Sequence, residues 1–183
     1  LNLDFITESG ADSLSNEKDI ELHPKYKDNG WIYITYASSN DDKNGANTSL
    51  MRFKISGNTI TNKELLYSAT PNSKKGQHFG SRIVFDDNND LYFSIGDRGN
   101  RNVNPQNIKR DGGKIYRLYD DGSIPIDNPF VKDRYAKKAI YSYGHRNPQG
   151  IAINPLSNEI WIHEHGPRGG DEINIISPGK NYG

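Results

Sequence analysis

The fold is decided by three stretches of sequence, WIYITY at residues 31–36, LYFSI at 91–95 and IWIH at 160–163. Each stretch is rich in β-branched and aromatic residues, which favour strands. Each follows a short apolar stretch that ends in a polar turn, namely IELHP at 20–24, IVFD at 83–86 and IAINP at 151–155. No long segment shows the apolar period of an amphipathic helix. The sequence therefore predicts a nearly all-β protein assembled from hairpins.

The hairpins form an internal repeat. Tyr33 and Tyr92 lie 59 residues apart, and Tyr92 and Trp161 lie 69 residues apart. This spacing suits the blades of a β-propeller, each of about four strands plus loops. The alternative is a β-sandwich whose hairpins are alike by accident. Propellers typically need ~4–8 blades to close. We therefore expect residues 1–183 to form a partial propeller of about three blades, the N-terminal to central part of a longer domain.

Composition excludes some classes of partner. The chain has 183 residues with 23 basic and 23 acidic side chains, so its formal net charge is zero. Balanced charge provides no field that would attract a nucleic-acid backbone or an anionic membrane, and we expect neither partner. Mean hydropathy is low, at −0.86. The 11 Tyr, 6 Phe and 2 Trp residues nevertheless argue against disorder.

The chain also lacks the marks of a disulfide-bonded or membrane-spanning protein. It contains no cysteine, which excludes disulfides and thiolate metal sites. No stretch approaches the ~20 apolar residues of a membrane span. Residues 1–10 lack the basic start and apolar core of a signal peptide, so we expect none within this segment.

Three polar blocks lie at the edges of the expected hairpins: QHFGSR at 77–82, YGHRNPQG at 143–150 and EHGPRGGDE at 164–172. They offer an imidazole, guanidinium groups, amides, carboxylates and backbone carbonyls. Such groups can remove a proton from an alcohol, stabilise a developing anion and bind a hard cation. Each block alone is more often a turn with a surface side chain. Because loops on one rim of a propeller converge on its axis, their joint occurrence favours a functional site.

The same three blocks resemble the signature segments of the soluble glucose/sorbosone dehydrogenases that depend on pyrroloquinoline quinone (PQQ), most of all the aldose sugar dehydrogenase branch. LHPKY at 22–26, NGWIY at 29–33 and GKNYG at 179–183 fit as well, so the resemblance covers nearly the whole chain from about Asp19. It implies a six-bladed propeller about twice this length. The rest of the propeller would then be required, because the basic residues that hold the PQQ carboxylates belong to the other half.

The resemblance also implies a reaction and a site. The family oxidises an aldose sugar at C1 to the lactone, and hydride passes to the quinone. His78 matches the general base that takes the proton of the anomeric hydroxyl, a role that suits imidazole. Arg146 and Asn147 match residues that contact the quinone carbonyl, and Gln149 matches another neighbour of the cofactor. Gln77 would face the sugar.

Calcium is the second cofactor that the resemblance implies. Gly166 and Pro167 match positions whose backbone carbonyls bind the calcium ion that bridges to PQQ. Glu172 and the carbonyl of Tyr182 match a separate, structural calcium site. Calcium accepts such oxygen ligands readily. The resemblance further implies a small-molecule sugar substrate and a periplasmic or secreted location, and it leaves the electron acceptor open.

Other functions remain open at this point. Members commonly carry a Gly-Gln-Gly-Gly-Leu-like stretch where this chain has residues 14–18, and its loss favours a non-catalytic extracellular binding propeller. A transition-metal hydrolase could use His163 and His165, which share a strand face at i and i+2, but no third ligand is near in sequence. The acidic run at 86–90 is interpreted as a hairpin turn, since it lacks the spaced glutamate of an EF-hand.

Overall fold

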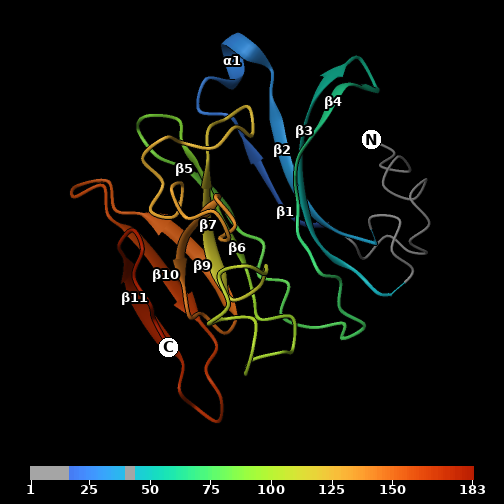
Figure 1. The fold of residues 1–183 in the computed structure, drawn as a ribbon. Helices are drawn as coiled ribbons and strands as arrows, with labels where there is room; N and C mark the ends of the chain where they lie inside the picture. The colour runs from blue at the N-terminus through green and yellow to red at the C-terminus, as the bar shows by residue number, and fades with distance from the viewer. Residues whose placement is uncertain (1–16, 40–43) are drawn as a thin grey trace.

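The structure is a computed structural model that describes residues 17–39 and 44–183. Residues 1–10, and the part of the 14–18 stretch before residue 17, lie outside the described residues. The described residues form eleven strands in three antiparallel sheets and one short helix (Figure 1). Within these ranges, no helix is long and apolar enough to cross a membrane.

The first sheet holds β1 (Glu17–Leu22), β2 (Ile32–Ser38), β3 (Asn47–Ser56) and β4 (Thr59–Ser68), paired in that order. The four-residue helix α1 (Tyr26–Asn29) lies between β1 and β2 and ends at Gly30, whose φ is 70°. Glycine adopts this left-handed conformation without the steric cost of a side chain. Every residue of β2 is buried, as expected for a strand covered on both faces.

The second sheet repeats this order with β5 (Ile83–Phe85), β6 (Leu91–Ile95), β7 (Lys114–Leu118) and β8 (Ile140–Tyr143). The third sheet holds β9 (Pro148–Ile153), β10 (Ile160–Glu164) and β11 (Glu172–Ile176). The three stretches that define the sequence repeat therefore form β2, β6 and β10, the second strand of each sheet. Each pairs antiparallel with the strand before it.

The sheets stack one against the next through their first strands. β5 contacts β1 and β2 of the first sheet, and β9 contacts β5 and β6 of the second. Consecutive residues of β6 serve opposite interfaces, because side chains of a strand alternate between faces. Phe93 packs with Tyr33 of the first sheet, whereas Tyr92 packs with Ile160 of the third. This alternation fixes the second sheet as the middle layer.

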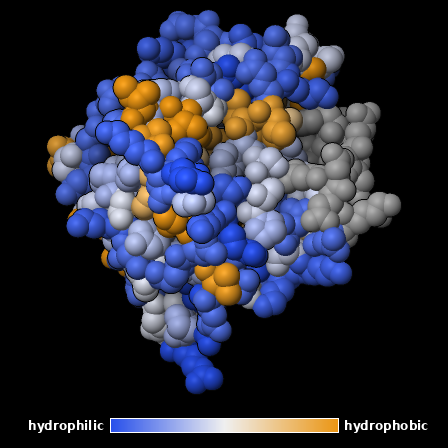
Figure 2. All heavy atoms as spheres, in the orientation of Figure 1, coloured by the Kyte–Doolittle hydropathy of each residue, from blue (hydrophilic) through white to orange (hydrophobic). Residues whose placement is uncertain are grey.

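Apolar side chains remain exposed on the outer face of the third sheet and on β1 of the first sheet. On the third sheet, Trp161, Ile173 and Ile175 are 38%, 74% and 43% exposed. On the first sheet, Ile20 and Leu22 are 59% and 47% exposed. Apolar surface of this kind marks an interface in a complete protein. Figure 2 shows apolar residues gathered in patches on an otherwise hydrophilic surface.

The connections divide between the two ends of the strands. The β4–β5, β6–β7, β8–β9 and β10–β11 connections share one rim, and they carry all three polar blocks. The β1–β2, β5–β6, β7–β8 and β9–β10 connections share the opposite rim. On that opposite rim, Asp86 Oδ1 accepts hydrogen bonds from the backbone N–H groups of Asn88 and Asp90, both at 2.9 Å. The interpretation of residues 86–90 as a hairpin turn is thus confirmed.

Candidate active site

Loops from the second and third sheets meet at the first rim. The backbone N–H of Asp97, in the β6–β7 connection, donates to the carbonyl of Arg146 in the β8–β9 connection at 2.7 Å. The side chain of Asp97 contacts His78, which precedes β5. Gly96 is wedged between His78 O and Asn147 Oδ1, with no room for a Cβ atom. The structure therefore brings His78, Arg146 and Asn147 together, although 69 residues of sequence separate His78 from Asn147.

His78 is held by one ring nitrogen. Its Nδ1 lies 2.7 Å from Asp97 Oδ1, which also accepts the backbone N–H of Gly99 at 2.6 Å. Asp97 Oδ1 is the acceptor in both contacts, so Nδ1 of His78 carries the proton and donates the hydrogen bond. The His78 side chain is 17% exposed and that of Asp97 is 1% exposed. Nε2 is left with the lone pair that a general base requires.

The backbone of His78 is strained, with a φ of 55°. Non-glycine residues seldom adopt a positive φ, and such residues gather at functional sites. Arg98 fixes this segment, because its guanidinium donates to the carbonyls of Gln77 and Lys75 and lies 3.4 Å from the centre of the Phe79 ring. Burial lowers the pKa of Arg98 to about 10, with Asp97 opposing that shift. Arg98 stays protonated at neutral pH.

Arg146 and Asn147 lie side by side in the β8–β9 connection. Arg146 Nη1 donates to the carbonyls of His165 and Gly166 at 2.8 and 3.1 Å. Gln149 Nε2 donates to Asn147 Oδ1 at 2.8 Å. The carbonyl of the Asn147 side chain is thereby engaged, and its amino group is the part that can donate to a ligand. Gln149 acts here on Asn147, and its direct contact with a cofactor stays a prediction.

A buried acid supports the Arg146 backbone. Glu164, the last residue of β10, accepts the N–H of Arg146 at 2.7 Å and the Nδ1 of His145 at 2.9 Å. His145 Nε2 lies 2.8 Å from Ser142 Oγ, and its ring stacks on Tyr182 with centroids 5.0 Å apart. Burial acts to raise the pKa of Glu164, but the hydrogen bond and charge of His145 and the backbone N–H of Arg146 outweigh it and lower the pKa. Glu164 is ionised at neutral pH.

Arg146 Nε and Asp97 Oδ2 are among the buried polar atoms at this rim that have no hydrogen-bond partner within the described residues. An orphaned buried donor or acceptor is costly, and functional sites are among the places where such atoms are retained. One is a donor and the other an acceptor. The rim can therefore bind a ligand that offers an acceptor near Arg146, which a quinone carbonyl does.

The four residues predicted to bind calcium line a single cavity of about 160 Å³, which Arg146 and Glu164 also line. They are Gly166, Pro167, Glu172 and Tyr182. Glu172 is exposed, and its Oε2 accepts from Asn174 at 3.0 Å. The sequence predicted two separate calcium sites, whereas the structure joins these residues in one hollow. The Gly166 carbonyl faces the guanidinium of Arg146.

No group of three or more His, Cys, Asp or Glu side chains that could hold a metal is found within residues 17–39 and 44–183. A calcium site built from backbone carbonyls would not need such a group. Calcium binding at this cavity therefore stays a prediction. The hydrolase alternative lacks support, because His163 lies on the open face of the third sheet beside Gly150, while His165 lies beyond β10 and pairs with Asp171 at 3.5 Å.

Gln77 is exposed, and its side chain lies next to Gly99. A contact with substrate stays a prediction. Sequence reasoning missed Asp97 and Glu164, which orient His78 and Arg146. For Asp97 a signal existed, because a carboxylate lies two residues after the apolar strand LYFSI, between Gly96 and Gly99. Glu164 begins the third block, but its burial depends on tertiary packing.

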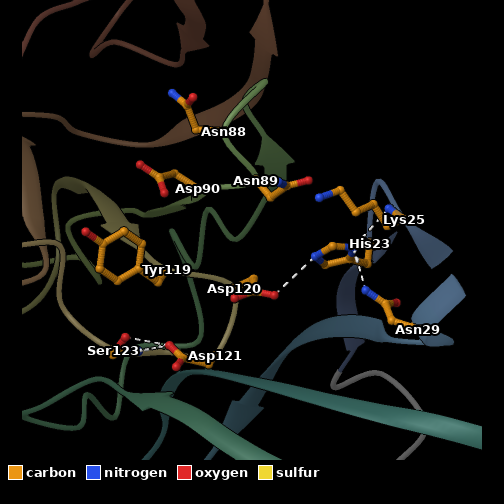
Figure 3. A pocket seen from close by; sticks show the side chains of 10 residues that line it. All are labelled: His23, Lys25, Asn29, Asn88, Asn89, Asp90, Tyr119, Asp120, Asp121 and Ser123. Carbon is orange, nitrogen blue, oxygen red and sulfur yellow. Dashed lines mark hydrogen bonds and ion pairs between the residues drawn. The ribbon is translucent and has the colours of Figure 1, made fainter.

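A larger polar hollow, of about 350 Å³, lies at the opposite rim. Figure 3 shows its lining, where His23 points toward Asp120 and Ser123 toward Asp121. Asp90, on the same wall, is paired with Arg117 at 2.5 Å. These acids are engaged within the protein, and the hollow lies at the other end of the strands from His78. Its size does not make it the candidate active site.

Comparison with known proteins identifies the family to which this chain belongs. The sequence profile of the glucose/sorbosone dehydrogenases matches residues 13–183, and the chain belongs to this family. The matching proteins of known structure are sugar dehydrogenases, and the blade-like sheets agree with them. The prediction of a partial, all-β propeller is confirmed, and the sandwich alternative is wrong.

Three relatives illustrate the match. Aldose sugar dehydrogenase YliI from Escherichia coli is 42% identical over 166 residues, 90% of this chain and 44% of that protein. Quinoprotein glucose dehydrogenase B from Acinetobacter calcoaceticus is 33% identical, over 94% of this chain and 40% of that protein. The PQQ-bound structure of aldose sugar dehydrogenase from Streptomyces coelicolor superposes with a TM-score of 0.77 at 31% identity, covering 94% of this chain and 49% of that one. The chain thus spans less than half the length of these relatives.

Proposed function

We propose that the protein to which this chain belongs oxidises an aldose sugar at C1 to the lactone and uses PQQ as hydride acceptor. The observation that carries the proposal is the pairing of His78 with buried Asp97 on the rim that also holds Arg146 and Asn147. The PQQ-bound and quinoprotein relatives support it. The remaining blades complete the cofactor site, and the location is periplasmic or secreted.

The residues present fit a bound quinone. Arg146 Nε and the amino group of Asn147 are the donors that would hold its carbonyl oxygen. PQQ, when bound, supplies an electron-poor carbonyl carbon that accepts hydride. A fixed cation beside the oxygen stabilises the negative charge that develops there. The bonds from Arg146 to His165 O and Gly166 O hold the guanidinium in place before any ligand arrives.

His78 performs the proton transfer. Its Nε2 takes the proton of the C1 hydroxyl, and the electron pair of that O–H bond forms the carbonyl of the lactone as C1 gives up its hydride. Asp97 stabilises the imidazolium that results, because its carboxylate already accepts the Nδ1–H. Gln77 contributes to binding of the sugar.

The first experiment reconstitutes the full-length protein with PQQ and calcium and measures reduction of a dye by a panel of aldoses. We expect turnover that depends on PQQ. Binding of PQQ without turnover on any aldose would contradict the proposal and favour the binding propeller.

A second experiment tests the cofactor contact. Arg146→Gln removes the charge beside the developing anion, and we expect kcat to fall about 10²–10³-fold. Arg134→Gln is the matched control, since Arg134 is exposed and its guanidinium lies over the ring of Tyr135. An equal effect of both substitutions would contradict the assignment.

The calcium proposal has its own test. We propose that the carbonyls of Gly166, Pro167 and Tyr182 and the carboxylate of Glu172 hold calcium in the 160 Å³ cavity. A ligand that binds only the folded state stabilises it. EDTA should therefore lower the Tm of the full-length protein, and Glu172→Ala should abolish that difference. An unchanged Tm after chelation would refute calcium binding here.

A further inference from the structure

Lys114, the first residue of β7, is fully buried. Its ammonium donates to three backbone carbonyls, those of Asn104, Pro105 and Gly112, with Nζ–O distances of 3.3 Å to Pro105 and 2.7 Å to Gly112. An ammonium has three N–H donors and no acceptor, so these carbonyls use all of them. We call Lys114 and its three carbonyls the lysine cage.

The cage is unusual because it holds a charge without an acid. Among the described residues, no carboxylate forms an ion pair with Lys114. The nearest acid, Asp111, is engaged by Tyr67 at 2.6 Å, by the N–H of Thr70 at 2.7 Å and by Lys137 at 2.9 Å. Backbone dipoles alone therefore solvate the charge. Lysine is seldom fully buried without an acidic partner, so the burial of Lys114 requires a specific explanation.

The cage joins both halves of the candidate active site. On one side, Asn104 Nδ2 donates to the carbonyl of Asp97 at 3.0 Å, and Asp97 holds His78. On the other side, Pro105 O accepts the N–H of Gly144 at 3.0 Å. Next to Lys114 in sequence, Gly113 O accepts the N–H of His145 at 3.1 Å. Asn104 and Pro105, whose carbonyls bind Lys114, are thus each linked by a single hydrogen bond to a loop of the proposed site: one holds His78 through Asp97, and the other carries Arg146.

We propose that Lys114 is a positioning residue of this site, a tethered cation that fixes the β6–β7 connection so that the His78–Asp97 pair and Arg146 keep their relative places. The inference rests on the proposed function for its effect on catalysis, but not for its effect on the loops. A metal ion in the same cage of carbonyls would act in the same way; Lys114 supplies that cation from the chain itself.

The test uses the full-length protein at pH 6, below the pKa of about 7 to which burial lowers Lys114, so that the ammonium is present. Lys114→Met keeps the length of the side chain and removes its charge and donors. We expect kcat to fall about 10- to 100-fold, because misplacement of a catalytic group by ~1 Å has effects of that size. The KM for the sugar should change less than twofold. Lys109→Met is the matched control, since Lys109 lies in the same connection but is exposed, and it should leave both constants unchanged.

Hydrogen exchange gives a readout that needs neither PQQ nor sugar. In Lys114→Met we expect the amides of Asp97, Gly144 and His145, which join the two loops, to exchange at least tenfold faster. Amides of β2 should be unaffected. If Lys114→Met fails to fold, Lys114→Gln, which keeps two donors, should show a smaller change in the same amides.

Chemical rescue distinguishes a cation from a filler of space. Lys114→Ala leaves an empty cage, and ammonium or methylammonium ions should restore kcat at least threefold, while sodium and tetramethylammonium should not. Unchanged exchange at the three amides, or a lower Tm with normal kcat, would overturn the proposal and leave Lys114 a stability residue. Absence of sugar oxidation by the wild-type protein would refute the proposed function, and the exchange result would still decide the role of the cage.

Discussion

Both rims carry a histidine paired with an aspartate, and the two pairs are built in opposite ways. At the first rim, the His78 side chain is 17% exposed and its partner Asp97 is 1% exposed. At the other rim, the His23 side chain is 3% exposed and Asp120 is 41% exposed. A histidine–aspartate pair that acts on a substrate needs a buried carboxylate and an imidazole that solvent or substrate can reach. The pair at the opposite rim has the reverse arrangement.

The second nitrogen of each ring completes the contrast. His23 Nδ1 accepts the backbone N–H of Lys25 at 2.9 Å, so it must carry the lone pair. Nε2 then carries the proton and faces Asp120 at 3.2 Å. Nδ1 is hydrogen-bonded, whereas Nε2 has only the ion-pair contact with Asp120 and no hydrogen bond among the described residues. Through this contact His23 joins the first sheet to the β7–β8 connection of the second. His78 uses Nδ1 for buried Asp97, and its ring is more exposed than that of His23, which is the arrangement that the proposed proton transfer requires.

The largest expected effect separates these two histidines. His78→Ala should lower kcat about 10²–10⁴-fold, the range typical of general bases, while the Tm changes little. His23→Ala should leave kcat within a few-fold and cost about 1–3 kcal/mol of stability, because it removes buried packing and leaves polar groups unpaired. Steady-state kinetics and thermal unfolding of the full-length variants measure both. The reverse pattern would make His23 the functional residue.

The next largest effect is expected at Asp97, the buried acid that contacts His78. Asp97→Asn preserves the shape but offers an amide where His78 Nδ1 needs a carboxylate, which disturbs the tautomer and the charge that supports imidazolium. We expect kcat to fall by roughly 10²-fold or more. The pH profile of kcat/KM should change as well, which a purely structural substitution would not cause. An Asp97→Asn enzyme with a wild-type profile would contradict the orienting role.

Lys114 extends the comparison to a buried charge with no acid partner. Burial lowers the pKa of Lys114 to about 7, Asp111 acts to raise it, and Arg110 acts to lower it further. The unfolded chain therefore binds more protons than the folded one between pH 7 and about 10, so this group makes stability rise with pH in that window. We expect a rise on the order of 2 kcal/mol from pH 7 to pH 9.

The matched measurement is the same pH series on Lys114→Met, where this rise should be absent. Tyr67 and Tyr116, whose pKa values burial raises well above 10, oppose it only at higher pH. Equal slopes for both proteins between pH 7 and pH 9 would show that Lys114 titrates normally.

The smallest expected effect is at Asp120. Asp120→Asn keeps a hydrogen-bond acceptor for His23, and the carboxylate it replaces is partly exposed. Partly exposed ion pairs contribute about 0–1 kcal/mol, and we expect a loss within that range, with normal kcat. A loss as large as that of His23→Ala would mean that the charge, rather than the packing of the ring, holds the two sheets together.

Much of the fold could be predicted because the local sequence of a strand indicates its conformation. The stretches at 31–36, 91–95 and 160–163 became β2, β6 and β10, since β-branched and aromatic residues favour strands. The convergence of His78, Arg146 and Asn147 followed from their place at hairpin edges. The repeat, rather than any single residue, carried that information.

The rest depended on tertiary packing. Nothing in KIYRL at 114–118 marks Lys114 as buried, because a strand that begins with lysine usually exposes it. Asp97 and Glu164 act through partners 19 residues away, a separation that no local pattern encodes. The four residues predicted to bind calcium line one cavity, and no local pattern places Tyr182 there, where its ring stacks on His145.

The left-handed backbone at His78 also limits how this site can change during descent. Proline is excluded at a φ of 55°, and β-branched residues are strongly disfavoured there. Asparagine adopts that conformation more readily than most residues and lies one nucleotide from histidine in the genetic code. A lineage that abandons the chemistry while keeping the scaffold should therefore drift first to asparagine at this position. Under the proposed function, asparagine at this position would remove the base and leave the backbone of the site unchanged.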